Sequence, residues 1–465
     1  MQTSRRKFLT SAASAALAGM ARGAADSQAE AWSQVPQILA RIKAPVFAKR
    51  DFEITRFGAV ADGKKDCTDA IARAIAECNR AGGGRVLVPA GIYSTAAIHL
   101  KSNVELHLSS GATLRFARNP KLYLPVVFTR FEGTECMNYS PFVYADGQEN
   151  IAITGQGTLD GNGDCDSWWA WAGKAGCRTG KPRQDDSRTR LTAMGDKDVP
   201  VEQRVFGDGW YLRPCFIQPV RSKNVLIEGV TIVNSPMYEL NPLLCTNVTI
   251  RGVKTVSHGP NNDGCDPDSC KDVLIEDCLF DTGDDCIAIK SGRNRDGRRA
   301  GVASENLVIR NCTMKDGHGG ITIGSEMSGG VRNVFAEACH LNSRNLNQAL
   351  RFKTNAVRGG TIENVYFRNL DIGEISDSVL QIDFNYQEGA NGSEHPNVRN
   401  IDIRDVTCRK AKYAWDIQGF ANDPVRNVHF ERCTFGNIAS ANVSKNVEAL
   451  TLTDVKINGK EVVRR

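Results

Sequence analysis

The sequence predicts an all-β protein with one large domain, a right-handed parallel β-helix in which each turn of the chain adds one coil to a stack. Three observations support this fold. A short phrase of Asn, a branched apolar residue and alternating apolar and polar positions recurs nine times. A second short strand and a turn containing Gly or Asn follow each phrase, and a short amphipathic helix precedes the series. Period-two alternation indicates strands, and units too small to bury their own apolar face are stable when they stack.

The N-terminus has the form of an export signal, which is removed and takes no part in the fold. Arg5 and Arg6 precede an Ala-rich run that is too short and too weakly apolar to span a bilayer. The stretch SRRKFL resembles the bacterial twin-arginine signal, which implies export of a folded protein; a chance basic N-terminus is the alternative. We expect a signal peptide over residues 1–25, an N-terminal extension over 26–50 and the β-helix over 51–465, in a periplasmic or secreted protein.

Charge and hydropathy exclude two classes of partner. The full chain has a formal net charge of +5, and loss of Arg5, Arg6, Lys7 and Arg22 with the signal leaves about +1. This is too little for the basic surface that nucleic-acid binding requires. No later segment is apolar enough for a membrane helix. We expect a monomer that meets any anionic partner through a local cluster of charge.

The amphipathic helix is expected between Phe57 and Gly91, where it covers the open end of the solenoid. Asp66 and Thr68 are suited to cap its first turn. Its apolar positions follow the helical period, and they are Ile71, Ala74, Ile75 and Cys78.

The repeat assigns a place to several of the fifteen cysteines. Four occupy the last position of the phrase, where other coils have Val or Leu, so we expect them to be reduced core residues: Cys278, Cys312, Cys339 and Cys433. The remaining cysteines, which include Cys165, Cys177, Cys265 and Cys270, are expected in loops, where they could pair. The recurrent Asn suits turn conformations and can stack its amide from coil to coil.

Four consecutive coils carry polar residues after the first strand. They continue as GPNNDGCDPDS, TGDDCIAIKSG, DGHGGITIGSE and QALRFKTN. Neighbouring strands lie about 4.8 Å apart, so equivalent positions in adjacent coils are close in space. The polar residues therefore form one column, which contains Asp263, Asp284, Asp285, His318, Arg351 and Lys353.

Such a column can perform acid–base chemistry. Two carboxylates in contact cannot both ionise without cost, so one pKa rises and that group can donate a proton to a leaving oxygen. Its ionised neighbours can draw a proton from water, which is the division of labour of inverting glycoside hydrolases. A bulge or turn must point both Asp284 and Asp285 to the same side. The alternative is an Asn/Asp turn ladder that only caps the coils.

These residues resemble the four motifs of glycoside hydrolase family 28, the polygalacturonases. The motifs Asn-Thr-Asp, Gly-Asp-Asp, Gly-His-Gly and Arg-Ile-Lys stand here as Asn261-Asn262-Asp263, Gly283-Asp284-Asp285, Gly317-His318-Gly319 and Arg351-Phe352-Lys353. Only Asn262 and Phe352 depart from the pattern, and neither is expected to do chemistry. The resemblance extends from about Phe57 to the C-terminus, through FGAVADG, LHLSSGATL and GTLDGNG.

The resemblance implies a role for each motif residue. Asp284 matches the general acid, Asp263 and Asp285 match the carboxylates that activate water, and His318 matches the residue that maintains the acid's protonation. Arg351 and Lys353 match the cations that hold a substrate carboxylate, and Asn261 would support the site. The family implies no metal and no cofactor. The expected partner is an acidic polysaccharide, galacturonan, or its oligosaccharides, because His318 and the Arg-x-Lys pair favour galacturonic acid at the cleaved linkage.

Two loops bear on how the substrate is held. The first carries Arg293, Arg295, Arg298 and Arg299, which either contact an anionic sugar or form a solvated loop. IAIKSGRNRDGRR and the following MKDGHGGITIGSEMSGG resemble bacterial members that release sugars from chain ends, which favours exo action. The second, Gly161 to Gly209, interrupts the repeat with Trp168, Trp169 and Trp171. These rings either form the floor of a sugar-binding site or pack the loop onto the barrel.

Three alternatives remain open from the sequence alone. The chain could hydrolyse rhamnogalacturonan or another pectin side chain within the same family. It could be a pectate lyase, in which carboxylates hold Ca²⁺ and an Arg or Lys is the base. It could also be a non-catalytic carbohydrate-binding β-helix, such as an adhesin.

Overall fold

The structure, a computed structural model, describes residues 30–173, 177, 180 and 182–464. The chain divides into two units after Arg41. The first contains helix α2 (Gln34–Arg41), and the second contains every strand that is described. The export signal expected over residues 1–25 lies outside the described residues and stays a prediction. In the described part of the chain, no helix is long and apolar enough to cross a membrane.

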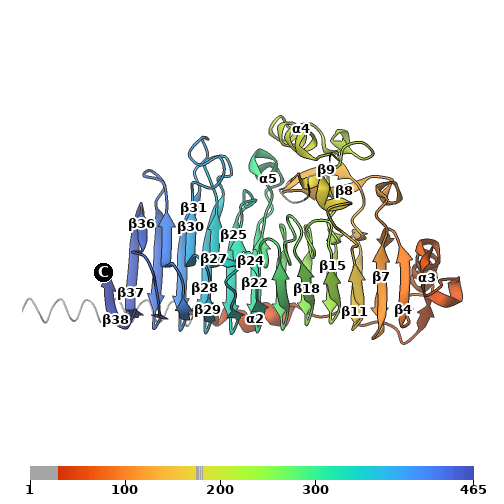
Figure 1. The fold of residues 1–465 in the computed structure, drawn as a ribbon, viewed down its shortest axis with the longest axis horizontal. Helices are drawn as coiled ribbons and strands as arrows, with labels where there is room; N and C mark the ends of the chain where they lie inside the picture. The colour runs from red at the N-terminus through yellow and green to blue at the C-terminus, as the bar shows by residue number, and fades with distance from the viewer. Residues whose placement is uncertain (1–29, 174–176, 178–179, 181, 465) are drawn as a thin grey trace, which may run out of the picture. The chain divides into compact units, whose positions relative to one another are not determined.

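The second unit is the predicted parallel β-helix, whose strands follow one another along the stack (Figure 1). All nine recurring phrases form strands that pair in parallel with the equivalent strand of the next coil, so that Val225 faces Val248 and Val248 faces Val273. This ladder comprises β1 (Asp51–Glu53), β3 (Gly84–Val88), β6 (Val104–Leu108), β11 (Glu149–Gly155), β15 (Lys223–Glu228), β17 (Thr246–Arg251), β19 (Lys271–Glu276), β22 (Ser304–Arg310), β25 (Val331–Glu337), β28 (Thr361–Arg368), β31 (Asn397–Arg404), β34 (Val425–Glu431) and β37 (Val447–Ile457).

Two further parallel ladders complete the coils. The second strand of each coil forms β2 (Asp62–Asp66), β4 (Gly91–Thr95), β7 (Ala112–Phe116), β12 (Thr158–Asp160), β16 (Thr231–Val233), β18 (Lys254–Ser257), β20 (Leu279–Thr282), β23 (Thr313–Met314), β26 (His340–Leu341), β29 (Asp371–Glu374), β32 (Thr407–Lys410) and β35 (Thr434–Phe435). The third ladder comprises β5 (Ile98–His99), β10 (Val143–Asp146), β14 (Ile217–Val220), β21 (Ile287–Ile289), β24 (Gly317–Ile323), β27 (Leu346–Lys353), β30 (Ser378–Asp383), β33 (Tyr413–Gln418) and β36 (Val443–Lys445). Isolated parallel bridges through Leu240 and Cys265 join β14 to β21.

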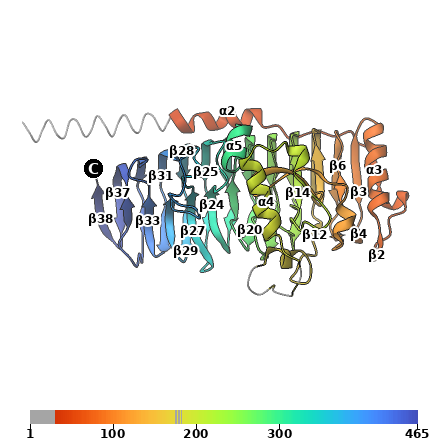
Figure 2. The same ribbon diagram turned by 90° about the horizontal axis from the view of Figure 1, so that it is seen from above.

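The remaining elements cover one end and one side of the stack. Helix α3 (Thr68–Arg80) is the predicted cap: it buries Ile71, Ala74, Ile75 and Cys78, and Asp66 Oδ1 accepts a hydrogen bond from Thr68 N at 2.9 Å. The antiparallel hairpin β8 (Val127–Phe131) and β9 (Thr134–Asn138), with β13 (Val205–Phe206), gathers on one side with α4 (Asp185–Asp196) and α5 (Asn294–Ala300) (Figures 1 and 2). At the C-terminus, β38 (Lys460–Arg464) pairs antiparallel with β37. The 3-10 turns are η1 (Ile54–Phe57), η2 (Pro120–Tyr123), η3 (Trp168–Ala172) and η4 (Val201–Gln203).

The recurrent Asn forms the amide ladder that the sequence predicts. Its backbone is left-handed in every coil, for example at φ 60° in Asn306 and 57° in Asn333. Asn333 Nδ2 donates to Asn306 Oδ1 at 3.1 Å, and the same bond joins most neighbouring coils. Asn is suited to this position because it tolerates a positive φ and its amide is both donor and acceptor.

The prediction for the cysteines is partly confirmed and partly wrong. Cys278, Cys312, Cys339 and Cys433 are buried free thiols, as predicted. Cys165 and Cys177 form a disulfide. Cys265 and Cys270, which were expected in loops, are instead buried free thiols inside the solenoid, each 0% exposed. The reason is that the third ladder continues through their coil as single bridges, without the alternation that marks a strand.

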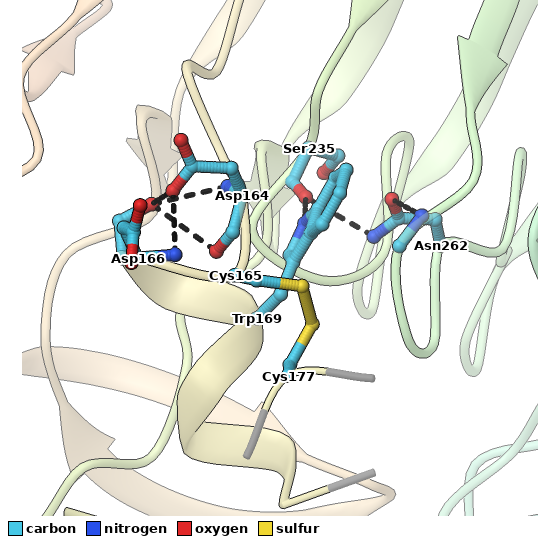
Figure 3. Close-up of a disulfide and its surroundings, with 9 residues drawn as sticks. Asp164, Cys165, Asp166, Trp169, Cys177, Ser235 and Asn262 are labelled. Carbon is cyan, nitrogen blue, oxygen red and sulfur yellow. Dashed lines mark hydrogen bonds between the residues drawn. A yellow bond between two sulfur atoms is a disulfide. The ribbon is translucent and has the colours of Figure 1, made fainter. Parts of the chain in front are cut away.

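The segment that interrupts the repeat packs onto the barrel. It contains η3, α4 and η4 rather than a continuous loop. Trp168 and Trp171 are buried in the main core. Of the two alternatives for these rings, packing of the segment onto the barrel is therefore confirmed, and a sugar-binding surface is not. Trp169 is half-buried and donates from Nε1 to Ser235 O at 2.8 Å, beside the disulfide (Figure 3).

Replacing one member of the amide ladder tests its contribution. Asn333→Ala should lower the free energy of unfolding by about 1–3 kcal/mol, because it removes the amide bonds and leaves a side chain in a left-handed backbone. Asn333→Gly is the matched control: it accepts the positive φ and loses only the amide bonds, so its cost should be smaller. Equal melting temperatures for the two variants would contradict a contribution from the backbone conformation.

Candidate active site

The four polar coils bring three carboxylates together. One carboxylate oxygen of each of Asp263, Asp284 and Asp285 lies within 4.8 Å of those of the other two. The two adjacent aspartates lie in the bend between β20 and β21, where Gly264 N donates to Asp285 O at 3.0 Å. This irregular backbone, which the sequence required, turns both side chains to one cluster. Asp263 and Asp285 are buried and Asp284 is partly exposed.

Asp285 is held by both cations of the Arg-x-Lys motif. Lys353 Nζ lies 2.6 Å from Asp285 Oδ2, and Arg351 Nη1 lies 3.2 Å from Oδ1. Burial by itself would raise the pKa of Asp285, but Lys353 and Arg351 outweigh that effect and hold the pKa below its usual value. Asp285 is therefore the member of the cluster whose ionised form the two cations stabilise.

Asp263 has the opposite electrostatic environment. Burial raises its pKa from the ordinary 3.8 to about 7, and the charge of Asp284 adds to the rise. Lys290, whose Nζ lies 3.5 Å from Asp263 Oδ2, opposes it. The raised pKa that the sequence led us to expect on the proton donor is thus found on Asp263, which matches a water-activating carboxylate. A carboxylate with a pKa near neutrality is a strong enough base to accept a proton from a reacting group.

His318 contacts the third carboxylate. His318 Nδ1 and Asp284 Oδ1 lie 2.9 Å apart, and this hydrogen bond raises the pKa of the imidazole. The glycines beside it leave room for the two aspartates: a Cβ at Gly319 would lie 2.8 Å from Asp285 Oδ1, and one at Gly317 would lie 2.7 Å from the carbonyl oxygen of Asp284. The side chain of His318 is 47% exposed, so the pair can exchange a proton with solvent.

The two departures from the motifs are structural. Phe352 is buried in the solenoid core, on the opposite face of its strand from Arg351 and Lys353. Asn262 accepts from Ser257 Oγ and Gly259 N and donates to Ser235 O, the carbonyl that Trp169 also contacts (Figure 3). These bonds fix the turn that precedes Asp263.

Three other residues that the sequence predicts for the site, Asn261, Arg293 and Arg298, contact residues other than the three carboxylates. Asn261 Oδ1 accepts from Arg213 Nη2 at 2.7 Å. Arg293 is buried between Glu132 and Glu388, at 3.2 and 3.5 Å. Arg298 donates to Val357 O and Arg358 O and pairs with Glu394 at 3.1 Å. The contact of Arg298 with substrate stays a prediction.

Three further residues of the site were not found from the sequence. Lys290 Nζ lies 3.5 Å from Asp263 and 3.7 Å from Asp266, and the ring of Tyr386 lies 5.4 Å from Lys353 Nζ. Lys290 follows the alternation of the core residues Ile287 and Ile289 and falls on the outward face with Ala288, so alternation along β21 could have identified it. Nothing local marks Tyr386, which is contributed by the loop after β30.

Two groups of acidic and histidine side chains are close enough together to be considered as metal-binding sites. The carboxylates of Asp263, Asp284 and Asp285 are close enough to share a divalent ion, but Lys353, Arg351 and Lys290 already supply their positive charge. This donor set therefore suits proton transfer better than metal binding. His258, Asp281 and Asp316 form a second, more exposed group. There His258 pairs with Asp281 at 3.1 Å, and Asp316 accepts from Asn345 Nδ2 at 3.0 Å.

Comparison with known proteins identifies the family. A model described as glycosyl hydrolases family 28 matches residues 209–458, which is more than half of the chain. The chain belongs to glycosyl hydrolases family 28. All four motif coils of this family 28 protein lie within the matched region.

Several relatives resemble it over most of their length. The crystal structure of a hyperthermoactive exopolygalacturonase from Thermotoga maritima superimposes with a TM-score of 0.90 at 44% identity, covering 92% of this chain and 96% of that one. A probable polygalacturonase of Vitis vinifera is 28% identical over 404 residues, or 83% of this chain and 74% of the relative. An exo-poly-alpha-D-galacturonosidase of Dickeya chrysanthemi is 25% identical over 460 residues, or 88% and 74%.

The contrasting charge states of two carboxylates predict opposite effects on stability. Because the folded-state pKa of Asp263 is raised, its ionisation costs stability as pH rises from about 4 towards 7. Asp263→Asn should therefore raise the free energy of unfolding by about 2–4 kcal/mol above pH 7, with little gain near pH 4. Thermal unfolding over this pH range is the measurement.

Asp285→Asn is the control of opposite sign. The folded-state pKa of Asp285 is lowered, so its charge stabilises the fold above the unfolded pKa, and this stability is lost as pH falls. The variant should lower the melting temperature at neutral pH. Shifts of the same sign for both variants would contradict the assigned charge states.

Proposed function

We propose that this family 28 protein is a polygalacturonase that hydrolyses α-1,4-galacturonosyl linkages of pectin, with inversion, from the ends of chains. The observation that carries hydrolysis of a uronic acid linkage is the cluster of three carboxylates within 4.8 Å, with two cations and an imidazole beside it. Inversion is taken from the family resemblance, because this separation is shorter than the roughly 6.5–9.5 Å usual between acid and base in inverting enzymes. The likeness to the Thermotoga maritima exopolygalacturonase supports both the substrate and the exo action.

The proposed mechanism divides the work between the three carboxylates. Asp284 donates its proton to the leaving glycosidic oxygen as the bond to the anomeric carbon breaks. Asp263 takes a proton from the water whose oxygen bonds to that carbon, and the ionised Asp285 stabilises the positive charge that develops on the sugar ring. His318, 2.9 Å from Asp284, returns a proton to it for the next cycle.

The two cations favour a uronic acid as substrate. Arg351 and Lys353 contact Asp285, and the side chain of Arg351 is 15% exposed. A substrate carboxylate beside them gains a charge-assisted bond that a neutral sugar cannot make. This supports homogalacturonan over rhamnogalacturonan or a neutral side chain.

A fixed wall beside the site supports exo action. The hairpin β8–β9 is tied to the solenoid by Arg130, which contacts Asp268 at 2.7 Å and Glu135 at 3.0 Å. At the hairpin tip, a Cβ on Gly133 would lie 2.7 Å from Glu326, which contacts Lys290 at 3.3 Å. The tip thus adjoins the charged cluster, and we propose that it closes one end of the substrate groove. Twin-arginine export and the monomeric state stay predictions from the sequence.

Removing the proposed acid tests the mechanism. Asp284→Asn should lower kcat on polygalacturonate by at least about 100-fold with the fold intact, because the leaving oxygen then receives no proton. Asp277→Asn is the matched control: this exposed residue of the same coil lies in a left-handed turn that suits Asn, so activity should be unchanged. Reducing-sugar release in EDTA is the measurement. Activity that EDTA abolishes, with unsaturated products, would instead identify a lyase.

The first product tests both exo action and stereochemistry. Proton NMR of a homogalacturonan digest should show monomeric galacturonic acid as the earliest product, and its anomeric signal should be that of the β form. An inverting enzyme acting on an α linkage releases the β anomer before mutarotation. A digest with Asp284→Asn provides the blank. An early ladder of oligomers would contradict exo action, and an initial α anomer would contradict inversion.

A further inference from the structure

Lys290 is a buried cation within the charged cluster that the proposed mechanism does not use. Its Nζ lies 3.5 Å from Asp263 Oδ2, 3.7 Å from Asp266 Oδ2 and 3.3 Å from Glu326 Oε2. The side chain is only 4% exposed. The ring of Tyr238 covers it, with its centroid 4.9 Å from Nζ. Because these groups surround the ammonium, it is not available to bind the substrate directly.

The fold fixes the position of Lys290 firmly. The residue directly follows β21 and forms a parallel bridge with Asp268 in the preceding coil. Its carbonyl accepts hydrogen bonds from Ser269 N at 2.9 Å and from Ser304 Oγ at 2.7 Å. An ammonium on such a rigid backbone acts on its neighbours as a fixed charge.

We propose that Lys290 is a positioning residue that keeps the Asp263 carboxylate ionised, so that Asp263 can accept a proton from the attacking water. The assignment of Asp263 as the base belongs to the proposed function, and this inference rests on it. Lys353, a second cation that acts on Asp263, is committed to Asp285 at 2.6 Å, and Arg213, a third, donates to Asn261 Oδ1 at 2.7 Å. Lys290 is therefore the fixed cation that balances Asp263.

Other charged groups also act on Asp263 and Lys290, and they affect how far Lys290 stabilises the ionised form of Asp263. Burial raises the pKa of Asp266 well above its ordinary range and the charge of Asp263 adds to the rise, whereas Lys290 opposes it. Glu326 is ionised, because Lys290, Arg358 and Arg293 outweigh its burial and lower its pKa. The titratable and charged groups that act on Asp263 or Lys290 are Cys215, Tyr238, Glu239, Asp266, Asp284, Asp285, Arg213, Glu326 and Lys353.

Variants of opposite charge should move the pH profile in opposite directions. Lys290→Met removes the cation, so Asp263 needs a higher pH to ionise, and the acid limb of kcat/KM should move up by about one pH unit. Lys290→Arg keeps the positive charge, so its acid limb should lie at the pH found for the parent protein. Glu326→Gln removes a competing anion, so the limb should move down. Asp277→Asn, at an exposed residue of the same coil, is the matched control and should leave the limb in place.

A purely structural role for Lys290 predicts a different pattern. Lys290→Met and Glu326→Gln would then both lower kcat with the acid limb unmoved, and that result would overturn the proposal. If Lys290→Met does not fold, the Glu326→Gln profile decides alone: a limb that stays or rises refutes the inference.

A readout that is independent of activity separates this inference from the proposed function. In the Lys290→Met background, ionised Asp263 has lost its cation, so Asp263→Asn should raise the melting temperature at pH 8 more than it does in the parent chain. An equal or smaller gain would overturn the inference even if the protein degrades galacturonan. A larger gain in a protein that does not act on galacturonan would keep the electrostatic role and refute only the function.

Discussion

The parallel register of adjacent coils is the constraint on which the rest of the structure depends. Val225, Val248 and Val273 occupy the same place in successive coils, and the Asn ladder repeats beside them. A slip of one residue would exchange the inward and outward faces of a strand. The same constraint brings Asp263, Asp284 and Lys353 together although they come from three different coils. The apolar stack and the charged cluster are therefore two consequences of one register.

Charge balance decides what the cluster can do. Three carboxylates within 4.8 Å would repel one another and lose hydration on burial. Lys353 and Arg351 stabilise the charge of Asp285, whereas the cation that contacts Asp263 is Lys290, which also contacts Asp266 and Glu326. One carboxylate is thus held ionised while its neighbour titrates near neutral pH. A site of this kind lowers the stability of the fold, because its chemistry requires buried charges that are only partly balanced.

The covering elements depend on buried charge as well. Arg130 joins the hairpin to Asp268 on the solenoid, and Arg204 joins the segment before β13 to Asp296 of α5 at 2.8 Å. All four side chains are at most 3% exposed. Breaking a buried pair leaves an unpaired charge, which is strongly destabilising. The hairpin is therefore a rigid part of the domain, which is what its proposed role in closing one end of the substrate groove requires.

The sequence by itself determined the coils, the capping helix, the inward cysteines and the polar column, because each depends on a period that neighbouring coils must share. The tertiary structure decided those side-chain positions and contacts that differ from one coil to the next. Cys265 and Cys270 lie in the core because their coil continues through single bridges. The partners of Arg298 and the position of Tyr386 depend on turns of unequal length. Lys290 gains its importance only from Asp266 and Glu326, which approach it across neighbouring coils, and no local pattern encodes such a contact.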